Sequence, residues 1–434
     1  MGLTTGEKHL LKKRLINDSL FMYISNVISL GSKFILTVLL ARYIGPEEFG
    51  VLQLAITAVS FISLFLDLKT DDAVIKFVSE YITSGDRPRV KAIAVISYVS
   101  NAVLGVVCMV VIYFLAPVAA ERVLHRGDST DLILIYTFGT VVSYIGRTSA
   151  AIIQGTKRFK LITALSIPSS VLKCAMPCVL IPFGMKAIMW GYAIPMAVYA
   201  AASTAIVFWI LRGTFAKRAS WNLIKEETRK GAYYVFHSSL SSTFKSFIVY
   251  IDVLILGFFR GPEEVAYYKF ALAFTSVFGF ISSPINAVIY PNLNSLWLKN
   301  DIDMFRKIIV KVMRYKMLII VPAAIAASVL SPVIIRLTVK EEFMPSAFAI
   351  LVVIWAVLLT NVFSWIKPVL IIWQKPHIST VGNFVIMAAM SALSFILVPA
   401  YGFKGSAVTY LLSYSFGIGL MLFYVYRYYR RFYS

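Results

Sequence analysis

The sequence predicts an all-α integral membrane protein with twelve transmembrane helices in two six-helix lobes. Three observations lead to this fold class: an apolar composition, many long hydrophobic runs, and a repeat that relates the two halves. Of the 434 residues, 59% are hydrophobic and only 15% are charged, and the mean hydropathy is +0.79. A soluble domain of this length would carry more charge on its surface. We therefore expect most of the chain to lie in a bilayer.

Hydrophobic runs that are long enough to cross a membrane recur along the whole chain. About 20 apolar residues in a helix cross the ~30 Å of hydrocarbon. Short polar joints separate the runs, and no alternation typical of strands competes with helix. The predicted spans cover residues 20–44, 49–80, 91–118, 131–153, 161–183, 187–211, 233–258, 265–296, 316–338, 347–373, 379–398 and 404–426.

The motif Gly-Pro-Glu-Glu occurs twice, at residues 45–48 and 261–264, and each copy follows the first span of its half. Two weaker echoes have nearly the same offset: FGMKAIMWGY with YGFKGSAVTY, and IIQGTKRF with IIWQKPHI. Echoes at one offset indicate a tandem duplication. We expect an N-terminal lobe over 1–216 and a C-terminal lobe over 217–434. Because six spans is an even number, the lobes would be related by a pseudo-two-fold axis along the membrane normal.

The repeated motif itself predicts a helix hairpin rather than a binding site. Gly45 can end the first helix in a left-handed conformation, and Pro46 suits the first turn of the next helix. Glu47 and Glu48 then lie near a helix N-terminus, where negative charge is favourable.

The distribution of basic residues predicts the orientation. The net charge is +21, which in a soluble protein would suggest nucleic-acid binding. With an inside N-terminus, the inside loops hold 26 Lys and Arg and the outside loops hold 8. The positive-inside rule then places both termini in the cytoplasm. Topology and contact with lipid headgroups explain the basic loops, and nucleic acid is not an expected partner.

The loops argue against an enzyme. The longest predicted outside segment, 117–131, is too short for a catalytic domain, and the inside segment 211–232 contains no Gly-rich phosphate loop. The four histidines are scattered, so no nucleophile, base and acid can be grouped. Cys174 and Cys178 lie one helical turn apart without a nearby His or acid, which favours buried inert thiols over metal ligands.

The segments KFILTVLLARYIGPEEFGVLQLA, FLDLKTDDAVIKFVSEY and INAVIYPNLNSL resemble polysaccharide exporters. These are O-antigen-type flippases of lipid-linked oligosaccharides, in a superfamily that also contains multidrug (MATE) exporters and lipid II flippases. The resemblance implies alternating access between two lobes, with spans one, two, seven and eight around a central cavity. It also implies a polyprenyl-pyrophosphate-linked oligosaccharide as substrate.

Charges inside the spans predict the site. Each charge at the bilayer centre costs about 2.5–3.5 kcal/mol, so buried cations need a partner or water. Lys76, Arg147, Lys269 and Lys367 lie near span ends, where their side chains can reach the headgroups. Four lysines lie near mid-span: Lys33, Lys69, Lys173 and Lys245. We expect them to face a water-filled cleft rather than to form isolated salt bridges within the protein.

Spacing refines this set. Lys69, Asp72 and Lys76 share one face of span two, although Asp72 and Lys76 could simply form an i,i+4 ion pair. Lys245 and Asp252 share a face of span seven. The expected substrate-binding residues are Lys33, Lys69, Lys76, Lys173 and Lys245, with Asp72 and Asp252 as counter-charges or coupling sites. The resemblance does not place span five, which carries Lys173, at the cavity.

Together these observations predict a flippase of the cytoplasmic membrane that moves a lipid-linked oligosaccharide to the outer leaflet for surface glycan assembly. A cationic cleft suits a pyrophosphate, whereas an exporter of cationic drugs would present unpaired acids. A multidrug exporter and a lipid II-type flippase remain the alternatives. No cofactor or metal is expected; sodium, protons or the membrane potential could drive transport. Membrane lipids and other polysaccharide-assembly proteins are the expected partners.

Overall fold

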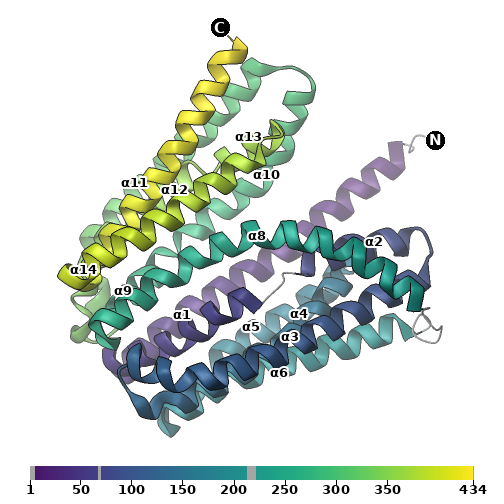
Figure 1. Cartoon of the computed structure of the whole chain (residues 1–434). Coiled ribbons are helices and arrows are strands. Elements are labelled where there is room, and N and C mark those ends of the chain that lie inside the picture. Colours follow the sequence, from purple (N-terminus) through teal and green to yellow (C-terminus); the bar gives the residue numbers. More distant parts are fainter. Residues whose placement is uncertain (1–4, 67–69, 213–220, 434) are drawn as a thin grey trace. The chain divides into compact units, whose positions relative to one another are not determined.

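The computed structural model describes residues 5–66, 70–212 and 221–433, and the regular structure within these ranges is helical (Figure 1). The α-helices are α1 (Thr5–Leu66), α2 (Asp71–Thr83), α3 (Arg87–Arg122), α4 (Thr130–Gly155), α5 (Phe159–Val179), α6 (Met185–Ile210), α8 (Trp221–Arg260), α9 (Pro262–Thr275), α10 (Phe278–Leu298), α11 (Ile302–Thr338), α12 (Ser346–Val362), α13 (Ile366–Ile372) and α14 (Pro376–Tyr433). Three short 3₁₀ turns, η1 (Gly127–Ser129), η2 (Ile181–Phe183) and η3 (Glu341–Phe343), lie between them.

Some predicted spans are joined in one helix and others are divided. Helices α1 and α14 each run through two predicted spans and contain one non-helical glycine, Gly45 and Gly402. The predicted span 49–80 is divided between α1 and α2, and 265–296 is divided between α9 and α10. Among the described residues, eight helices are long and apolar enough to cross a membrane.

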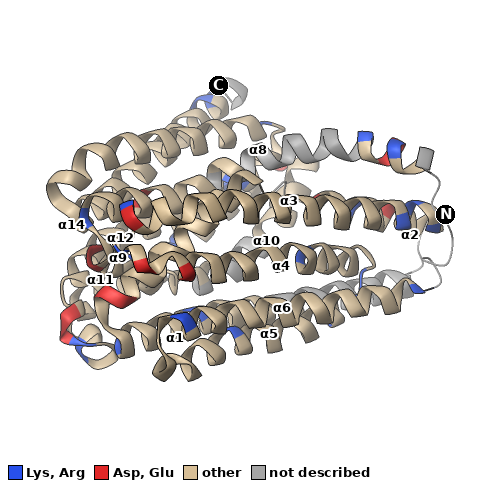
Figure 2. Cartoon of the chain, turned by 60° about the horizontal axis from the view of Figure 1, so that its bottom comes forward, with Lys and Arg blue, Asp and Glu red and all other residues tan. Residues whose placement is uncertain are grey.

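The long helices carry their charges near their ends. Helix α3 has its charged residues only among its first five and its last two residues, and α6 has only Lys186 (Figure 2). Large apolar side chains along α3, such as Val106 and Phe114, are exposed. An exposed apolar surface of this length is what a helix presents to lipid.

The two Gly-Pro-Glu-Glu hairpins share one backbone conformation. Gly45 has φ 80° and ψ 172°, and Gly261 has φ 87° and ψ −176°. The φ is positive, as predicted, but the ψ is extended rather than left-handed helical. Only glycine occupies this region at low cost. Pro262 lies in the first turn of α9, and the hairpin therefore reverses the chain between α8 and α9.

One glutamate of each motif, Glu48 and Glu264, bonds to another segment instead of acting only on its own helix dipole. The Glu48 carboxylate accepts from the Arg126 guanidinium at 2.7 Å. The Glu264 carboxylate accepts from the backbone N–H of Phe403 at 2.7 Å, directly after the kink at Gly402. Arg260 donates to the carbonyls of Pro399 and Ala400, on the other side of the same kink. The second hairpin thus satisfies backbone groups that the kink removes from the helical ladder of α14.

The chain divides into two compact units. Unit 1 comprises Met1–Leu36, Ile62–Pro117 and Thr130–Ser242, and unit 2 comprises Thr37–Phe61, Val118–Ser129 and Thr243–Ser434. Both Gly-Pro-Glu-Glu hairpins therefore belong to unit 2. The lobes predicted at 1–216 and 217–434 rest on the sequence repeat, and they remain a prediction.

In unit 1, the first turns of α8 are held against the connection between α2 and α3. The Glu227 carboxylate is fully buried; it accepts from the Tyr81 hydroxyl at 2.6 Å and lies 3.6 Å from the Arg89 guanidinium. A buried carboxylate needs such partners, because an unpaired charge is costly to desolvate.

In unit 2, the two hairpins lie against each other. A methyl group on Gly50, in α1, would overlap the backbone carbonyl of Pro262. Phe49 beside it packs on Phe343, with ring centroids 6.0 Å apart, and Phe343 packs on Phe270 at 5.4 Å. The aromatic contacts bury all three rings.

This contact predicts that Gly50→Ala destabilises the protein. The added methyl cannot be accommodated by a side-chain rotation, since it meets backbone, and overpacking costs about 1–3 kcal/mol or more. Gly31→Ala is the matched control, because it is also a helical glycine in α1 and no atom lies within 4 Å of its added methyl. Thermal unfolding in detergent should show a lower midpoint for Gly50→Ala alone; equal midpoints for both variants would contradict the close approach.

Candidate functional site

Two of the predicted lysines interact electrostatically in unit 1. Lys33 comes from α1 and Lys173 from α5, and the positive charge of Lys33 acts on the Lys173 ammonium. Lys33 is exposed and Lys173 is half-buried. The Lys173 ammonium also lies 5.6 Å from the ring centroid of Tyr199 on α6, a cation–π contact. Lys173 therefore lies within electrostatic reach of Lys33, although the family resemblance did not place its helix at the cavity.

An acid completes this group. Asp71 is the first residue of α2, and its charge acts on the Tyr199 hydroxyl. We refer to Lys33, Asp71, Lys173 and Tyr199, from four helices of unit 1, as the lysine cluster. The sequence singled out Asp72 rather than Asp71; Asp72 is exposed on the next position of α2. Two adjacent aspartates point in different directions on a helix, and only the packing of α2 decides which one faces the site.

Hydrogen bonds between buried polar side chains fix the start of α2 beside this cluster. The Asn101 amide of α3 donates to the hydroxyls of Thr70 and Thr148. Thr70 directly precedes α2. A satisfied polar network inside a membrane protein holds its members in one arrangement, because each group has few alternatives there. The Thr70 contact therefore positions Asp71.

The structure describes the other predicted substrate-binding residues only in part. Lys69 lies outside the described residues, as does the side chain of Lys245, so their roles remain predictions. Because α2 begins at Asp71, only Asp72 and Lys76 of the predicted trio lie on it. Lys76 is exposed, with its ammonium 5.4 Å from the Phe77 ring centroid.

Asp252 lies at the centre of a second group, in unit 2. Its side chain is buried, accepts a hydrogen bond from the Tyr268 hydroxyl and accepts another from the N–H of Val253. The charge of Lys269 acts on it from the same helix as Tyr268. Lys269, which the sequence placed near a helix end and the headgroups, thus faces a buried carboxylate.

Two tyrosines of α14 border the same carboxylate. The rings of Tyr410 and Tyr414 have centroids 4.7 Å apart, and both hydroxyls interact electrostatically with Asp252. We call Asp252, Tyr268, Lys269, Tyr410 and Tyr414 the aspartate cluster. The predicted pairing of Asp252 with Lys245 concerns a side chain that is not described, and it stays a prediction.

Lys316 is a functional candidate that sequence reasoning missed. Lys316 is the first residue of the predicted span 316–338, where a side chain can reach the headgroups, but α11 already begins at Ile302 and buries it to 1% exposure. Its ammonium donates to the Ser364 hydroxyl at 2.6 Å and to the Asn361 carbonyl at 3.2 Å, where α12 ends. The signal was the spacing, since Lys316 continues the buried stripe of Ile320 and Ala324 by one helical turn.

Metal chemistry has no obvious place in these clusters. Among the described residues, no group of three or more His, Cys, Asp and Glu could hold a metal ion. Cys108, Cys174 and Cys178 are free thiols; Cys108 is buried, but Cys174 and Cys178 are only partly buried, so the prediction of buried thiols is wrong for this pair.

Solved structures with the same fold define the class of protein. An inward-facing multidrug resistance MATE family transporter of the MOP superfamily superposes with a TM-score of 0.73 at 14% identity, over 92% of this chain and 93% of that one. Lipid II flippase MurJ in an inward closed conformation superposes with a TM-score of 0.69 at 15% identity, over 94% of this chain and 87% of that one. The chain is a multi-pass integral membrane protein with the fold of these transporters.

The sequence defines the family. Residues 15–297 match the family described as "Polysaccharide biosynthesis protein", and the chain belongs to it. A relative from Haloferax volcanii, described as "Probable low-salt glycan biosynthesis flippase Agl15", is 21% identical over 411 residues, which are 92% of this chain and 81% of that protein. This is a transporter family and not an enzyme family, as the loops predicted.

The aspartate cluster predicts a stability effect. Tyr268→Phe removes the hydroxyl that donates to Asp252. A buried carboxylate oxygen then loses this hydrogen bond, and the free energy of unfolding should fall by about 1–3 kcal/mol. Tyr113→Phe is the control, because that ring is exposed and its hydroxyl has no hydrogen bond among the described residues. Thermal unfolding in detergent should separate the two variants. A midpoint for Tyr268→Phe that matches the control would show that this hydrogen bond contributes nothing to folding.

Proposed function

We propose that this protein is a flippase that moves a polyprenyl-pyrophosphate-linked oligosaccharide from the cytoplasmic to the outer leaflet, for surface glycan assembly. Membership of the polysaccharide biosynthesis family supports this function, and so do the name of the Haloferax relative and the fold shared with a lipid II flippase. The observation that carries the proposal is that the positive charge of Lys33 acts on Lys173, a half-buried ammonium that lies over the Tyr199 ring.

Two like charges on apolar helices favour an anionic ligand. Bringing ammonium groups together in a membrane is unfavourable, and the cost falls when an anion enters between them. Lysine ammonium groups bind phosphate oxygens as point charges. A pyrophosphate that links lipid and sugar supplies such an anion, whereas a cationic drug would be repelled.

The remaining predicted residues extend this mechanism. Lys69, Lys76 and Lys245 add phosphate contacts, while Asp72 and Asp252 serve as counter-charges or as sites for a coupling ion. Twelve spans in two lobes would alternate in access, with both termini in the cytoplasm. The membrane potential, negative inside, favours outward movement of an anion by about 2.3 kcal/mol per charge per 100 mV. A sodium or proton gradient would add to this, and other polysaccharide-assembly proteins would supply and receive the substrate.

The proposal predicts that Lys33→Gln and Lys173→Gln each lower transport about tenfold or more. A charge-assisted hydrogen bond contributes about 1.5–3 kcal/mol, and 1.4 kcal/mol corresponds to a factor of ten. The assay is translocation in proteoliposomes of the lipid-linked oligosaccharide extracted from the source membranes and labelled on its sugar. Lys186→Gln is the control, because it removes one lysine from an exposed ion pair with Asp131.

Three results would count against the proposal. Transport no faster than in empty vesicles would exclude this substrate class. Equal rates for the lysine variants and the Lys186→Gln control would remove the role of the lysine cluster. Efflux of cationic drugs that is indifferent to both lysines would favour the multidrug exporter, whose fold the chain shares.

A further inference from the structure

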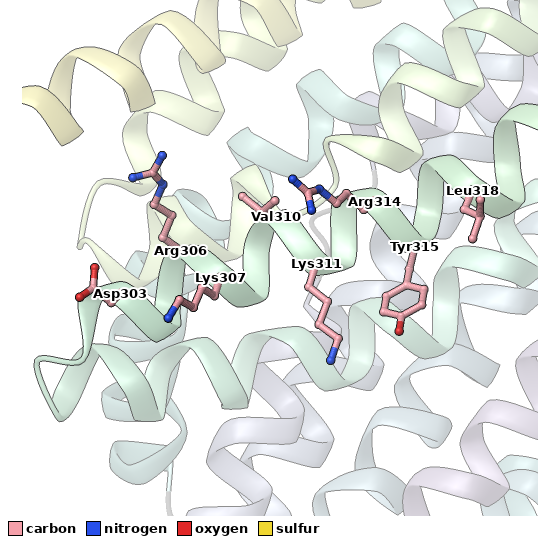
Figure 3. Close-up of a pocket in the computed structure, with 8 residues that line it drawn as sticks. All are labelled: Asp303, Arg306, Lys307, Val310, Lys311, Arg314, Tyr315 and Leu318. Atoms are coloured by element: carbon pink, nitrogen blue, oxygen red, sulfur yellow. The ribbon is translucent and has the colours of Figure 1, made fainter.

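A basic face of α11, in unit 2, borders a cavity that the transport mechanism does not use. The cavity has a volume of about 770 Å³ (Figure 3). Four cations line it: Arg306, Lys307, Lys311 and Arg314. The other lining residues are Asp303, Val310, Tyr315 and Leu318. We call the four cations together with Tyr315 and Leu318 the α11 basic face.

The residues of this face follow the helical repeat. Lys307, Lys311, Arg314 and Leu318 are spaced by four, three and four positions, so their Cα atoms lie along one face of α11, from which the long side chains can extend in different directions. Figure 3 shows Arg306 and Arg314 extending to one side of the helix, and Lys307 and Lys311 extending to the other. The four charged groups are therefore distributed along the helix in two pairs and are not concentrated at one point.

The four cations are not neutralised within the described part of the chain. No ion pair there joins any of them to an acid, and Asp303 is the single acid that lines the cavity. Arg89, Arg126 and Arg336, by contrast, each pair with a carboxylate. The exposed ammonium and guanidinium groups of the four cavity-lining cations thus leave a net positive electrostatic potential at the cavity.

The face changes from polar to apolar along the helix. Tyr315 is 54% exposed and Leu318 is 72% exposed, and Ile325 and Val329 continue as exposed apolar side chains. On the opposite side of α11, Lys316, Ile320 and Ala324 are buried against the protein. The cavity therefore lies where the charged start of α11 meets its lipid-facing part.

We propose that the α11 basic face binds the phosphate headgroup of an anionic phospholipid, with the acyl chains lying along Tyr315 and Leu318. Charge complementarity selects the phosphate, and the adjoining apolar side chains select a ligand that carries hydrocarbon. A soluble anion would use only the first half of this surface. The α11 basic face shares no residue with the lysine cluster, and the proposal does not depend on which substrate is transported.

The test is binding of phosphatidylglycerol to the purified full-length protein in detergent, measured by native mass spectrometry at several salt concentrations. In the variant Lys311→Gln/Arg314→Gln, we expect the dissociation constant to rise tenfold or more. The variant Lys311→Arg/Arg314→Lys keeps the charges and should bind as the unmodified protein does. The matched control is Arg427→Gln/Arg430→Gln, which removes two exposed cations of α14 that are not among the residues lining the cavity.

Binding and competition measurements with other ligands identify the bound molecule. Phosphatidylcholine should bind weakly, and inorganic phosphate should not compete at concentrations comparable with the lipid. Equal losses in the α11 and α14 variants would overturn the proposal, since only total charge would matter. Competition by inorganic phosphate as effective as that by the lipid would overturn the lipid assignment. Loss of polyprenyl pyrophosphate binding with phosphatidylglycerol binding retained would show that the face serves the transported substrate instead. All four side chains are exposed, so thermal unfolding should be the same in every variant.

Discussion

The structure depends on one constraint: in hydrocarbon, each backbone polar group and each charge needs a partner, because water is not available. This is why the described chain is built from helices, which satisfy their own backbone. Where a helix must break, other groups replace the lost bonds. At Gly402, Arg260 bonds the carbonyls before the kink and Glu264 bonds the N–H after it. The second Gly-Pro-Glu-Glu hairpin therefore not only turns the chain but also supplies hydrogen-bond partners to the backbone groups around this kink.

The same constraint sorts the buried charges into two kinds. Lys316 and Asp252 are satisfied within the protein, by Ser364 and the Asn361 carbonyl in one case and by Tyr268 in the other. Such groups stabilise one arrangement of helices, and removing a partner is costly. At the lysine cluster, the like charge of Lys33 acts on Lys173, whose ammonium also lies over the Tyr199 ring. A site that gathers like charges is suited to a ligand of opposite sign.

The fold is shared at 14–15% identity with transporters whose names indicate different substrates. This is expected, because the arrangement of apolar helices tolerates any side chain of suitable size and hydropathy, whereas ligand choice depends on a few charges. Fold likeness to a MATE transporter or to MurJ therefore does not decide the cargo. The sign of the charge at the lysine cluster is the more informative property of this chain.

The sequence by itself determined the helical membrane class, the family and the glycine hairpins, since composition, hydrophobic runs and backbone preferences are local properties. It also identified Lys33, Lys173 and Asp252 as residues that need an explanation. Only the tertiary structure decided that the charge of Lys33 acts on Lys173, that Asp71 rather than Asp72 acts on Tyr199, and that Lys316 is buried. These facts depend on how each helix is rotated about its axis and which helix it packs against. Successive residues of a helix are turned by about 100°, so neighbours such as Asp71 and Asp72 face different directions. No local feature of the sequence determines which of these directions faces a neighbouring helix.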